Sequence, residues 1–276
     1  MIESFIITFR EMFEVALVVG IILGYLSRTK QTKYNNIVYL GVVAGIVASI
    51  VGALLFNTLA GGFEGRAEQI FEGTTMLFGA LLLTTMIFWM MKQKHVALHL
   101  EKKVEEHISN FRKYGLFLLA FVAVLREGIE TVIFLEAASF VSEQNNLFWA
   151  LGGIIAAIFL GYLLFVSSRK INIKRFFNMT SILLILFAAG LVSHGIHEFE
   201  EANLVPSIKK NVWDINPALN QDGSYPALHE KGVIGSMLKG LLGYNGNPSL
   251  TEVLSYVAYL AIIVLLWRKV EKVNVK

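Results

Sequence analysis

Long apolar stretches, separated by shorter polar connections, make up most of this chain. A helix rises about 1.5 Å per residue, so roughly 20 apolar residues cross a hydrocarbon core about 30 Å thick. Seven stretches reach this length, near residues 2–27, 36–60, 72–91, 114–141, 147–167, 178–199 and 250–267. The pattern predicts an all-α polytopic membrane protein with seven transmembrane helices.

Lysine and arginine are distributed unevenly between the connections. Two of the 24 lie inside spans, and the connections after the second, fourth and sixth spans hold only five: Arg66, Lys209, Lys210, Lys231 and Lys239. The remaining 17 lie in the other connections and the C-terminal tail. Cytoplasmic loops carry the excess of basic residues. We therefore expect a plasma-membrane protein whose N-terminus lies outside and whose C-terminus lies in the cytoplasm.

The segment 200–249 differs in composition from the rest of the chain. It holds all four prolines and several turn-forming residues, which predict a structured outer loop. Within it, apolar residues recur at helical spacing at Val233, Ile234, Met237, Leu238, Leu241 and Leu242. We expect a short helix here that lies on, or dips into, the membrane surface.

Composition narrows the chemistry further. Hydrophobic residues make up 55% of the 276 residues and charged residues 16%, whereas a soluble domain usually carries about 25% charged residues. There is no cysteine, so a metal site must use oxygen or imidazole ligands. A net charge of +3 without a basic patch argues against a nucleic-acid partner, and membrane lipid is the expected surrounding.

One short charged motif occurs twice inside the apolar stretches. Arg10-Glu11-Met12-Phe13-Glu14 lies in the first span, and Arg126-Glu127-Gly128-Ile129-Glu130 lies in the fourth. Equivalent points three spans apart run in opposite directions through the membrane. This predicts a single membrane domain (1–276) with an inverted repeat, in which 1–91 and 114–199 form the two halves and 250–267 is added. Transporters are commonly built in this way.

The charges of the two motifs make them candidates for a cation site. A charged side chain in the middle of a span costs on the order of 3 kcal/mol, so six such groups need partners. Arg10 can reach Glu14 and Arg126 can reach Glu130 on the same helix face, which leaves two carboxylates in excess. Glu11, Glu14, Glu127 and Glu130 therefore form a candidate site for a hard metal cation. Iron(III), manganese, calcium and magnesium all remain open, as do buried ion pairs that only fix helix packing.

Two further groups lie near the predicted outer surface. Glu64, Glu68 and Glu72 are spaced by four, and on a helix they would form an acidic stripe that leads cations into the third span. A solvated helix start explains Glu64 and Glu68 equally well, whereas a functional role is favoured for Glu72, which lies deepest. His194, His197 and Glu198 share a face of the sixth span and could form a transient metal site or a hydrated polar cluster. These six residues are the candidate route into the site.

Two other patterns have simpler explanations. His95, His99 and His107 lie among lysines and glutamates between the third and fourth spans, where a solvated amphipathic helix is favoured over a metal site. Small residues lie four apart at Gly20 and Gly24, at Gly41 and Gly45, and at Gly153, Ala157 and Gly161. This spacing indicates close packing between helices in lipid.

The doubled motif in seven spans resembles the oxidase-dependent iron transporter family, which includes fungal high-affinity iron permeases and bacterial EfeU-type permeases. The resemblance covers nearly the whole chain and is closer to the bacterial branch. Other segments that carry it are Glu72-Gly73, the run from Gly190 to Glu198, Val212-Trp213-Asp214, and the run from Gly240 to Tyr244.

The resemblance implies a high-affinity iron permease and not an enzyme. It implies that Glu11, Glu14, Glu127 and Glu130 bind iron, with Arg10 and Arg126 supporting them. The transported ion would be iron(III) made from iron(II), with no permanent cofactor. Extracytoplasmic iron-binding or iron-oxidising proteins would be the partners, and a homo-oligomer is left open.

Three alternatives to iron transport remain at this stage. The first is a transporter of another divalent metal, such as manganese or lead, which competition uptake would separate. The second is an intramembrane enzyme that uses the buried carboxylates for acid–base chemistry, although the sequence shows no nucleophile pattern. The third is a structural or sensory membrane protein, which predicts no metal flux.

Overall fold

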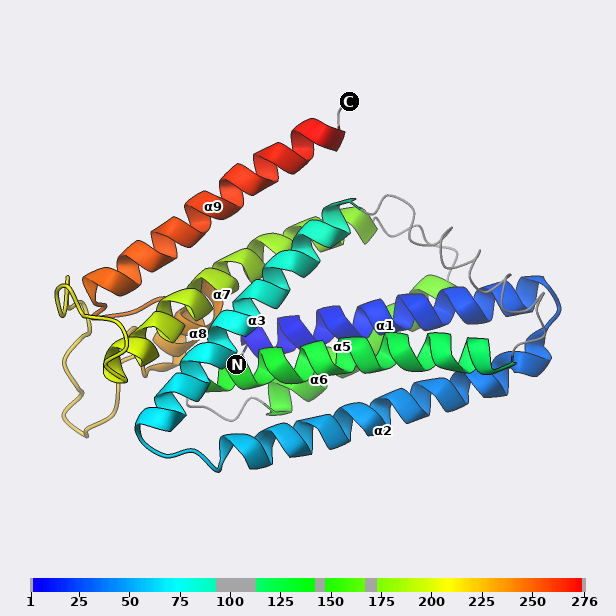
Figure 1. The fold of residues 1–276 in the computed structure, drawn as a ribbon, viewed down its shortest axis with the longest axis horizontal. Coiled ribbons are helices and arrows are strands. Elements are labelled where there is room, and N and C mark those ends of the chain that lie inside the picture. The colour runs from blue at the N-terminus through cyan, green and yellow to red at the C-terminus, as the bar shows by residue number, and fades with distance from the viewer. Residues whose placement is uncertain (1, 93–112, 142–146, 167–172, 275–276) are drawn as a thin grey trace.

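The computed structural model describes residues 2–92, 113–141, 147–166 and 173–274, which form helices and connections without a strand (Figure 1). The long helices are α1 (Ile2–Arg28), α2 (Asn35–Ala60), α3 (Arg66–Lys92), α5 (Lys113–Val141), α6 (Leu147–Val166), α7 (Ile173–Glu201) and α9 (Leu250–Asn274). A 3-10 helix, η1 (Thr32–Tyr34), precedes α2, and the short helix α8 (Val233–Leu242) precedes α9. The all-α fold class is confirmed.

Each predicted span coincides with one long helix. Within the described part of the chain, four segments are long and apolar enough to cross a membrane: Thr32–Ala60, Arg66–Trp89, Met179–Glu201 and Leu250–Lys269. The other three long helices are not in this set of four. α1 and α5 carry the charged motifs within their apolar sequence, and the apolar segment Leu147–Leu163 of α6 is shorter than the four segments above. These helices support an integral membrane protein, whereas the number of seven spans stays a prediction. His95, His99 and His107 lie outside the described residues.

Close glycine contacts show how the two motif-bearing helices pack. A Cβ on Gly41 of α2 would come 2.6 Å from the Phe117 carbonyl oxygen of α5, and one on Gly45 would come 2.8 Å from the Val124 Cβ. α2 therefore runs parallel to α5, with a separation that larger residues would not allow.

The same contact recurs between α1 and α6. A Cβ on Gly153 would come 2.5 Å from the Phe5 carbonyl oxygen, and one on Gly161 would come 2.8 Å from the Ala16 Cβ. α1 and α6 are therefore parallel as well. A Cβ on Gly24 would meet no heavy atom of the described residues within 4 Å, so the expected close packing at this glycine stays a prediction.

α3 and α7 form the third pair and run in opposite directions. Gly73 of α3 lies against Gly195 of α7, whereas Gly79 lies against Leu191. In an inverted repeat, α1, α2 and α3 correspond to α5, α6 and α7. The contact between α1 and α6 then corresponds to the contact between α5 and α2, and the contact between α3 and α7 corresponds to itself. Figure 1 shows α1 and α5 side by side and running in opposite directions. This is the geometry that an inverted repeat requires.

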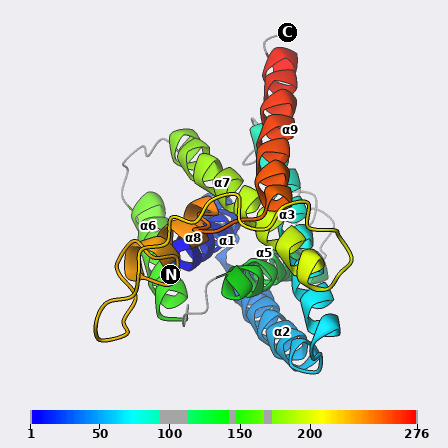
Figure 2. The same ribbon diagram turned by 90° about the vertical axis from the view of Figure 1, so that its left-hand side faces the viewer.

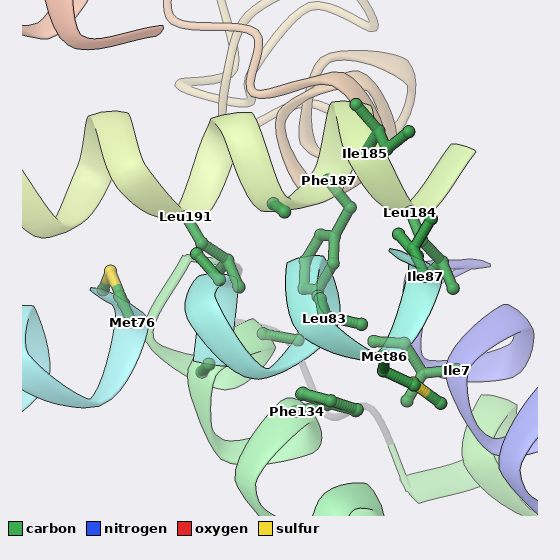
Figure 3. Packing of buried hydrophobic residues seen from close by; sticks show 14 of the residues in the cluster. Ile7, Met76, Leu83, Met86, Ile87, Phe134, Leu184, Ile185, Phe187 and Leu191 are labelled. Carbon is green, nitrogen blue, oxygen red and sulfur yellow. The ribbon is translucent and has the colours of Figure 1, made fainter. Parts of the chain in front are cut away.

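The main apolar core lies where α3, α5 and α7 meet the first half of α1. Figure 3 shows Met86 of α3 beside Ile7 of α1, with Phe134 of α5 and Phe187 of α7 in the same cluster. These four side chains are at most 4% exposed. The core therefore ends against the first charged motif, which begins three residues after Ile7.

The outer loop and α8 cover the end of the molecule at which α1 begins, as Figure 2 shows. The beginning and the end of the loop are hydrogen-bonded to each other. The Val212 amide donates to the Pro248 carbonyl oxygen, and the Leu250 amide donates to the Lys209 carbonyl oxygen. The short helix expected at 233–242 is confirmed as α8. Its Gly240 lies directly over the buried Glu3 carboxyl group, while its apolar residues Val233 and Ile234 face outward.

Candidate metal centre

The first motif forms an almost fully buried charge cluster on α1. Arg10 Nη1 lies 3.1 Å from Glu11 Oε1, and Arg10 Nη2 lies 3.3 Å from Glu14 Oε1. Nη1 also donates to the Met86 sulfur of α3 at 2.9 Å. Neither Arg10 nor Glu11 is exposed, whereas the Glu14 side chain is slightly exposed. The predicted reach from Arg10 to Glu14 is confirmed.

The second motif repeats these pairings on α5 in a more open setting. Arg126 Nε donates to Glu130 Oε1 at 2.9 Å and lies 3.7 Å from Glu127 Oε1. The Arg126 guanidinium carbon lies 4.9 Å from the ring centre of Trp89 on α3, a cation–π contact. The Arg126 side chain is 42% exposed, while Glu127 is buried. The two halves of the cluster therefore have the same pairing but different access.

Carboxylates from both helices converge between α1 and α5. Glu11, Glu14 and Glu127 each offer an oxygen, and these three oxygens lie within 4.8 Å of one another. Glu130 is not part of this set of three and is instead held by Arg126. The structure thus brings three of the four predicted ligands within the reach of one ion.

Each motif keeps carboxylate oxygens that no hydrogen bond occupies. Glu11 Oε2, Glu127 Oε2 and Glu130 Oε2 are buried and have no hydrogen-bond partner among the described residues. Leaving a buried acceptor unsatisfied costs about 1–3 kcal/mol. The arginines therefore do not use up the binding capacity of the carboxylates, and a cation between the helices would satisfy these oxygens.

The antiparallel arrangement places the two arginines on opposite sides of the carboxylates. Each arginine precedes its glutamates in sequence, and α1 runs away from the outer-loop end while α5 runs toward it. Arg10 therefore lies on the outer-loop side of the cluster, and Arg126 lies on the other side. With all six groups ionised the cluster carries a formal charge of −2, which favours a bound cation.

The acidic stripe predicted at the start of the third span is only partly formed. α3 begins at Arg66, after Gly65, which has a φ of 59°. Glu68 and Glu72 lie on α3, one turn apart, but Glu64 lies in the connection before it. The condition for a three-residue stripe, a helix that includes Glu64, is therefore not met.

The histidine group is rearranged around a residue that the sequence did not single out. His197 Nδ1 lies 3.0 Å from Glu252 Oε1 of α9, and His197 Nε2 lies 3.3 Å from Glu201. His194 instead turns its Nδ1 to the Gly190 carbonyl oxygen of its own helix, 2.9 Å away. Among the described residues, the groups placed to share a metal with His197 are Glu200 and Glu252, and Glu198 is not one of them.

Sequence reasoning also missed the α3 residues that hold the arginines. Met86 and Trp89 look like ordinary apolar positions of a span, and only the packing of α3 against α1 and α5 shows their contacts. Glu252 had one available signal, since it is an acidic residue in the first turn of an otherwise apolar helix.

Fold and site together define a polytopic helical membrane protein with a buried carboxylate centre between two antiparallel helices. The sequence matches the Iron permease FTR1 family over residues 1–273, and the chain belongs to this family. Its members are transporters and not enzymes, which agrees with the non-enzymatic function expected above.

Relatives match across nearly the whole chain. A ferrous iron permease EfeU of Yersinia pestis is 32% identical over 266 residues, which cover 94% of this chain and 90% of the relative. A ferrous iron permease EfeU of Escherichia coli O6:H1 is 31% identical over 267 residues, which cover 94% and 92%. An uncharacterized protein of Archaeoglobus fulgidus is 34% identical over 261 residues, which cover 95% and 92%. No solved structure matches the chain.

Proposed function

We propose that this protein transports iron across the cytoplasmic membrane and that the ion passes between α1 and α5. The observation that carries the proposal is the convergence of Glu11, Glu14 and Glu127 within 4.8 Å, in a family of iron permeases. Glu130 joins them when the ion draws it away from Arg126. Arg10 and Arg126 hold the carboxylates in place and lower the repulsion between them.

The ligand chemistry supports iron, but by itself it does not select the oxidation state of the ion. The residues described at the centre offer carboxylate oxygens and neither thiolate nor imidazole, which suits a hard cation. The bacterial relatives are named for ferrous iron. We propose that iron arrives as iron(II), that a partner protein outside the membrane transfers one electron from each ion to an oxidant of the dioxygen or peroxide class, and that the resulting iron(III) is bound between the helices.

The route into the centre begins at the outer-loop end. Glu68 and Glu72 on α3, with Glu64 in the connection before it, gather cations by their negative field. His194, His197 and Glu198 lie at the same end, on the last turns of α7. We place this end outside the cell and the C-terminus in the cytoplasm, so iron passes Arg10 first and Arg126 last.

The halves 1–91 and 114–199 act as the two members of an inverted repeat in this proposal. The matching α1–α6 and α2–α5 pairs support it, because each repeat then contributes one helix to each pair. Rocking of one half against the other would change access to a site at their interface. The Arg126 side chain is 42% exposed and the Arg10 side chain is not exposed, which supports different access to the two sides of the site.

Uptake of radioactive iron by cells tests the proposal. Glu14→Gln and Glu127→Gln keep the size of the side chain but remove a ligand charge, and each is expected to lower uptake at least tenfold. Glu136→Gln, on α5 but outside the cluster, is the matched control and should keep uptake within about twofold. Wild-type uptake by both cluster variants, at equal membrane levels, would refute the proposal, and excess manganese that abolishes iron uptake would favour a different cargo.

A further inference from the structure

A second cluster of metal-ligand side chains lies at the outer-loop end of α7 and α9. His197 and Glu200 of α7 and Glu252 of α9 each offer one ligand atom, and these atoms lie within 4.8 Å of one another. We call His197, Glu200 and Glu252 the outer cluster. It contains an imidazole, unlike the trio of carboxylates between α1 and α5.

Glu252 is held in a fixed orientation by the outer loop. Its Oε1 accepts a hydrogen bond from the Ser249 amide at 3.0 Å, and its Oε2 accepts one from the Asn245 side-chain amide at 2.7 Å. The residue is 1% exposed. Donors of this kind orient metal-binding carboxylates and keep them ready for an ion.

Glu200, another member of the outer cluster, has unused ligand capacity. Its Oε1 is buried and has no hydrogen-bond partner among the described residues. Buried polar atoms without a partner are unusual in a packed structure. A metal ion held by the outer cluster would satisfy this oxygen.

The spacing within the outer cluster fits shared coordination. Two ligand atoms that bind one ion at right angles, each about 2.1 Å from it, are about 3.0 Å apart. His197 Nδ1 and Glu252 Oε1 are 3.0 Å apart. Mixed imidazole and carboxylate ligands suit divalent transition metals such as iron(II).

We propose that the outer cluster is a second metal site, which binds a divalent first-row transition metal through His197, Glu200 and Glu252. Its position on the last turns of α7 and the first turn of α9 puts it at the outer-loop end, apart from the carboxylate centre on α1 and α5. We further propose that this site captures iron before the ion reaches the carboxylate centre, and we call this its loading role. The loading role rests on the proposed iron function, but the ability of the outer cluster to bind a metal does not.

The alternative is a hydrogen bond between His197 and Glu252 that only joins α7 to α9. The two explanations differ in one spectroscopic property, since a bound Cu²⁺ ion reports directly coordinated imidazole through nitrogen modulation in pulsed electron paramagnetic resonance. A purely structural pair gives no such signal at one equivalent of metal.

The experiment uses full-length protein in detergent with one equivalent of Cu²⁺. Glu14→Gln and Glu127→Gln remove the carboxylate centre, and glutamine replaces His95, His99, His107 and His229, so that only two of the six histidines remain. We expect an imidazole signal that His197→Gln abolishes and His194→Gln preserves. Absence of the signal in the background protein, or its survival in His197→Gln, would overturn the proposal.

A Co²⁺ titration in the same background measures affinity. Glu200→Gln and Glu252→Gln are each expected to raise the dissociation constant at least tenfold, while Glu230→Gln in the outer loop should leave it within about twofold. Glu200 is partly exposed, so its substitution tests the site even where Glu252→Gln fails to fold. Unchanged affinity in a folded Glu200→Gln protein would refute its place in the site.

Iron uptake separates the loading role from the carboxylate centre. In otherwise wild-type cells, Glu200→Gln is expected to raise the KM for iron at least fivefold with maximal uptake preserved, because capture is weakened and passage is not. Loss of maximal uptake with an unchanged KM would contradict a loading role. The metal-binding measurements above do not depend on this outcome, because they are made without the carboxylate centre.

Discussion

Arg10 and Arg126 occupy equivalent motif positions but have different surroundings. Arg10 is unexposed, binds both glutamates of its motif and contacts the Met86 sulfur. Arg126 makes the same two glutamate contacts while 42% of its side chain stays exposed over Trp89. Burial decides how much the loss of each arginine costs, because a carboxylate left in a fully enclosed place has nothing else to pair with.

Removing the two arginines should therefore have unequal effects on stability. Arg10→Ala leaves Glu11 and Glu14 buried without their cation, which costs about 3–5 kcal/mol. Arg126→Ala should cost less than this, because 42% of the Arg126 side chain is exposed and water can partly replace it beside Glu130. In thermal melting of purified protein we expect a drop of roughly 10 °C for Arg10→Ala and at most a few degrees for Arg126→Ala. Equal drops would show that the difference in burial has no energetic consequence.

The sequence predicted the carboxylates but not the residues around them. A motif that places charges inside an apolar stretch is visible in one dimension, so Glu11, Glu14, Glu127 and Glu130 could be named. The contacts of Met86 and Trp89 depend on how α3 packs, which no local pattern encodes. Glu252 was missed for the same reason, since its partner His197 lies 55 positions away.

At the scale of helices, small residues determine which pairs approach closely. Gly41 and Gly45 allow α2 to pack closely against α5, and Gly153 and Gly161 allow α6 to pack closely against α1. The spacing of four predicted close packing but could not say which glycines take part. Gly24 shares the spacing, yet a Cβ there would meet no heavy atom of the described residues within 4 Å, because the face that a helix buries is set by its neighbours.

A pair of glycines on α2 tests this packing. Gly41→Ala forces a Cβ within 2.6 Å of the Phe117 carbonyl oxygen, and overpacking of this kind costs about 1–3 kcal/mol. Gly52→Ala on the same helix meets no heavy atom of the described residues within 4 Å and should stabilise the helix by about 0.5–1 kcal/mol. Melting temperatures should move in opposite directions. A higher melting temperature for Gly41→Ala would show that α2 and α5 are not in close contact.

Helix ends were predictable to within seven residues, since the spans predicted at 72–91 and 250–267 lie in helices of residues 66–92 and 250–274. An acidic stripe from Glu64 to Glu72 required a helix that includes Glu64, but Gly65 adopts a positive φ and α3 starts at Arg66. Periodicity in the side chains cannot reveal where the backbone turns. The proline-rich loop and α8 were predictable because both have strong local signals.

On the scale of the whole molecule, the chain has two ends with different character. The outer loop and α8 cover the end where α1 begins, and η1 lies at the other end of α1, next to Arg28 (Figure 1). The distribution of basic residues predicts that the η1 end faces the cytoplasm. The helix directions agree with an inverted repeat but do not by themselves say which end is outside.

Single cysteines can settle this orientation, because the natural chain has none. Gln221→Cys lies in the outer loop and Thr32→Cys in η1, and both positions are exposed. A membrane-impermeant maleimide should label Gln221→Cys in intact cells and should label Thr32→Cys only after the membrane is permeabilised. The reverse pattern would place the outer loop in the cytoplasm.

The proposed transport function depends on one feature, the surplus of buried carboxylates between α1 and α5. Its most direct test is an iron anomalous-difference map from crystals of the protein grown with iron. We predict a peak at coordination distance from Glu11, Glu14 and Glu127, and its loss in Glu14→Gln. A map with no iron between these helices, in crystals whose fluorescence shows bound iron, would contradict the proposed centre.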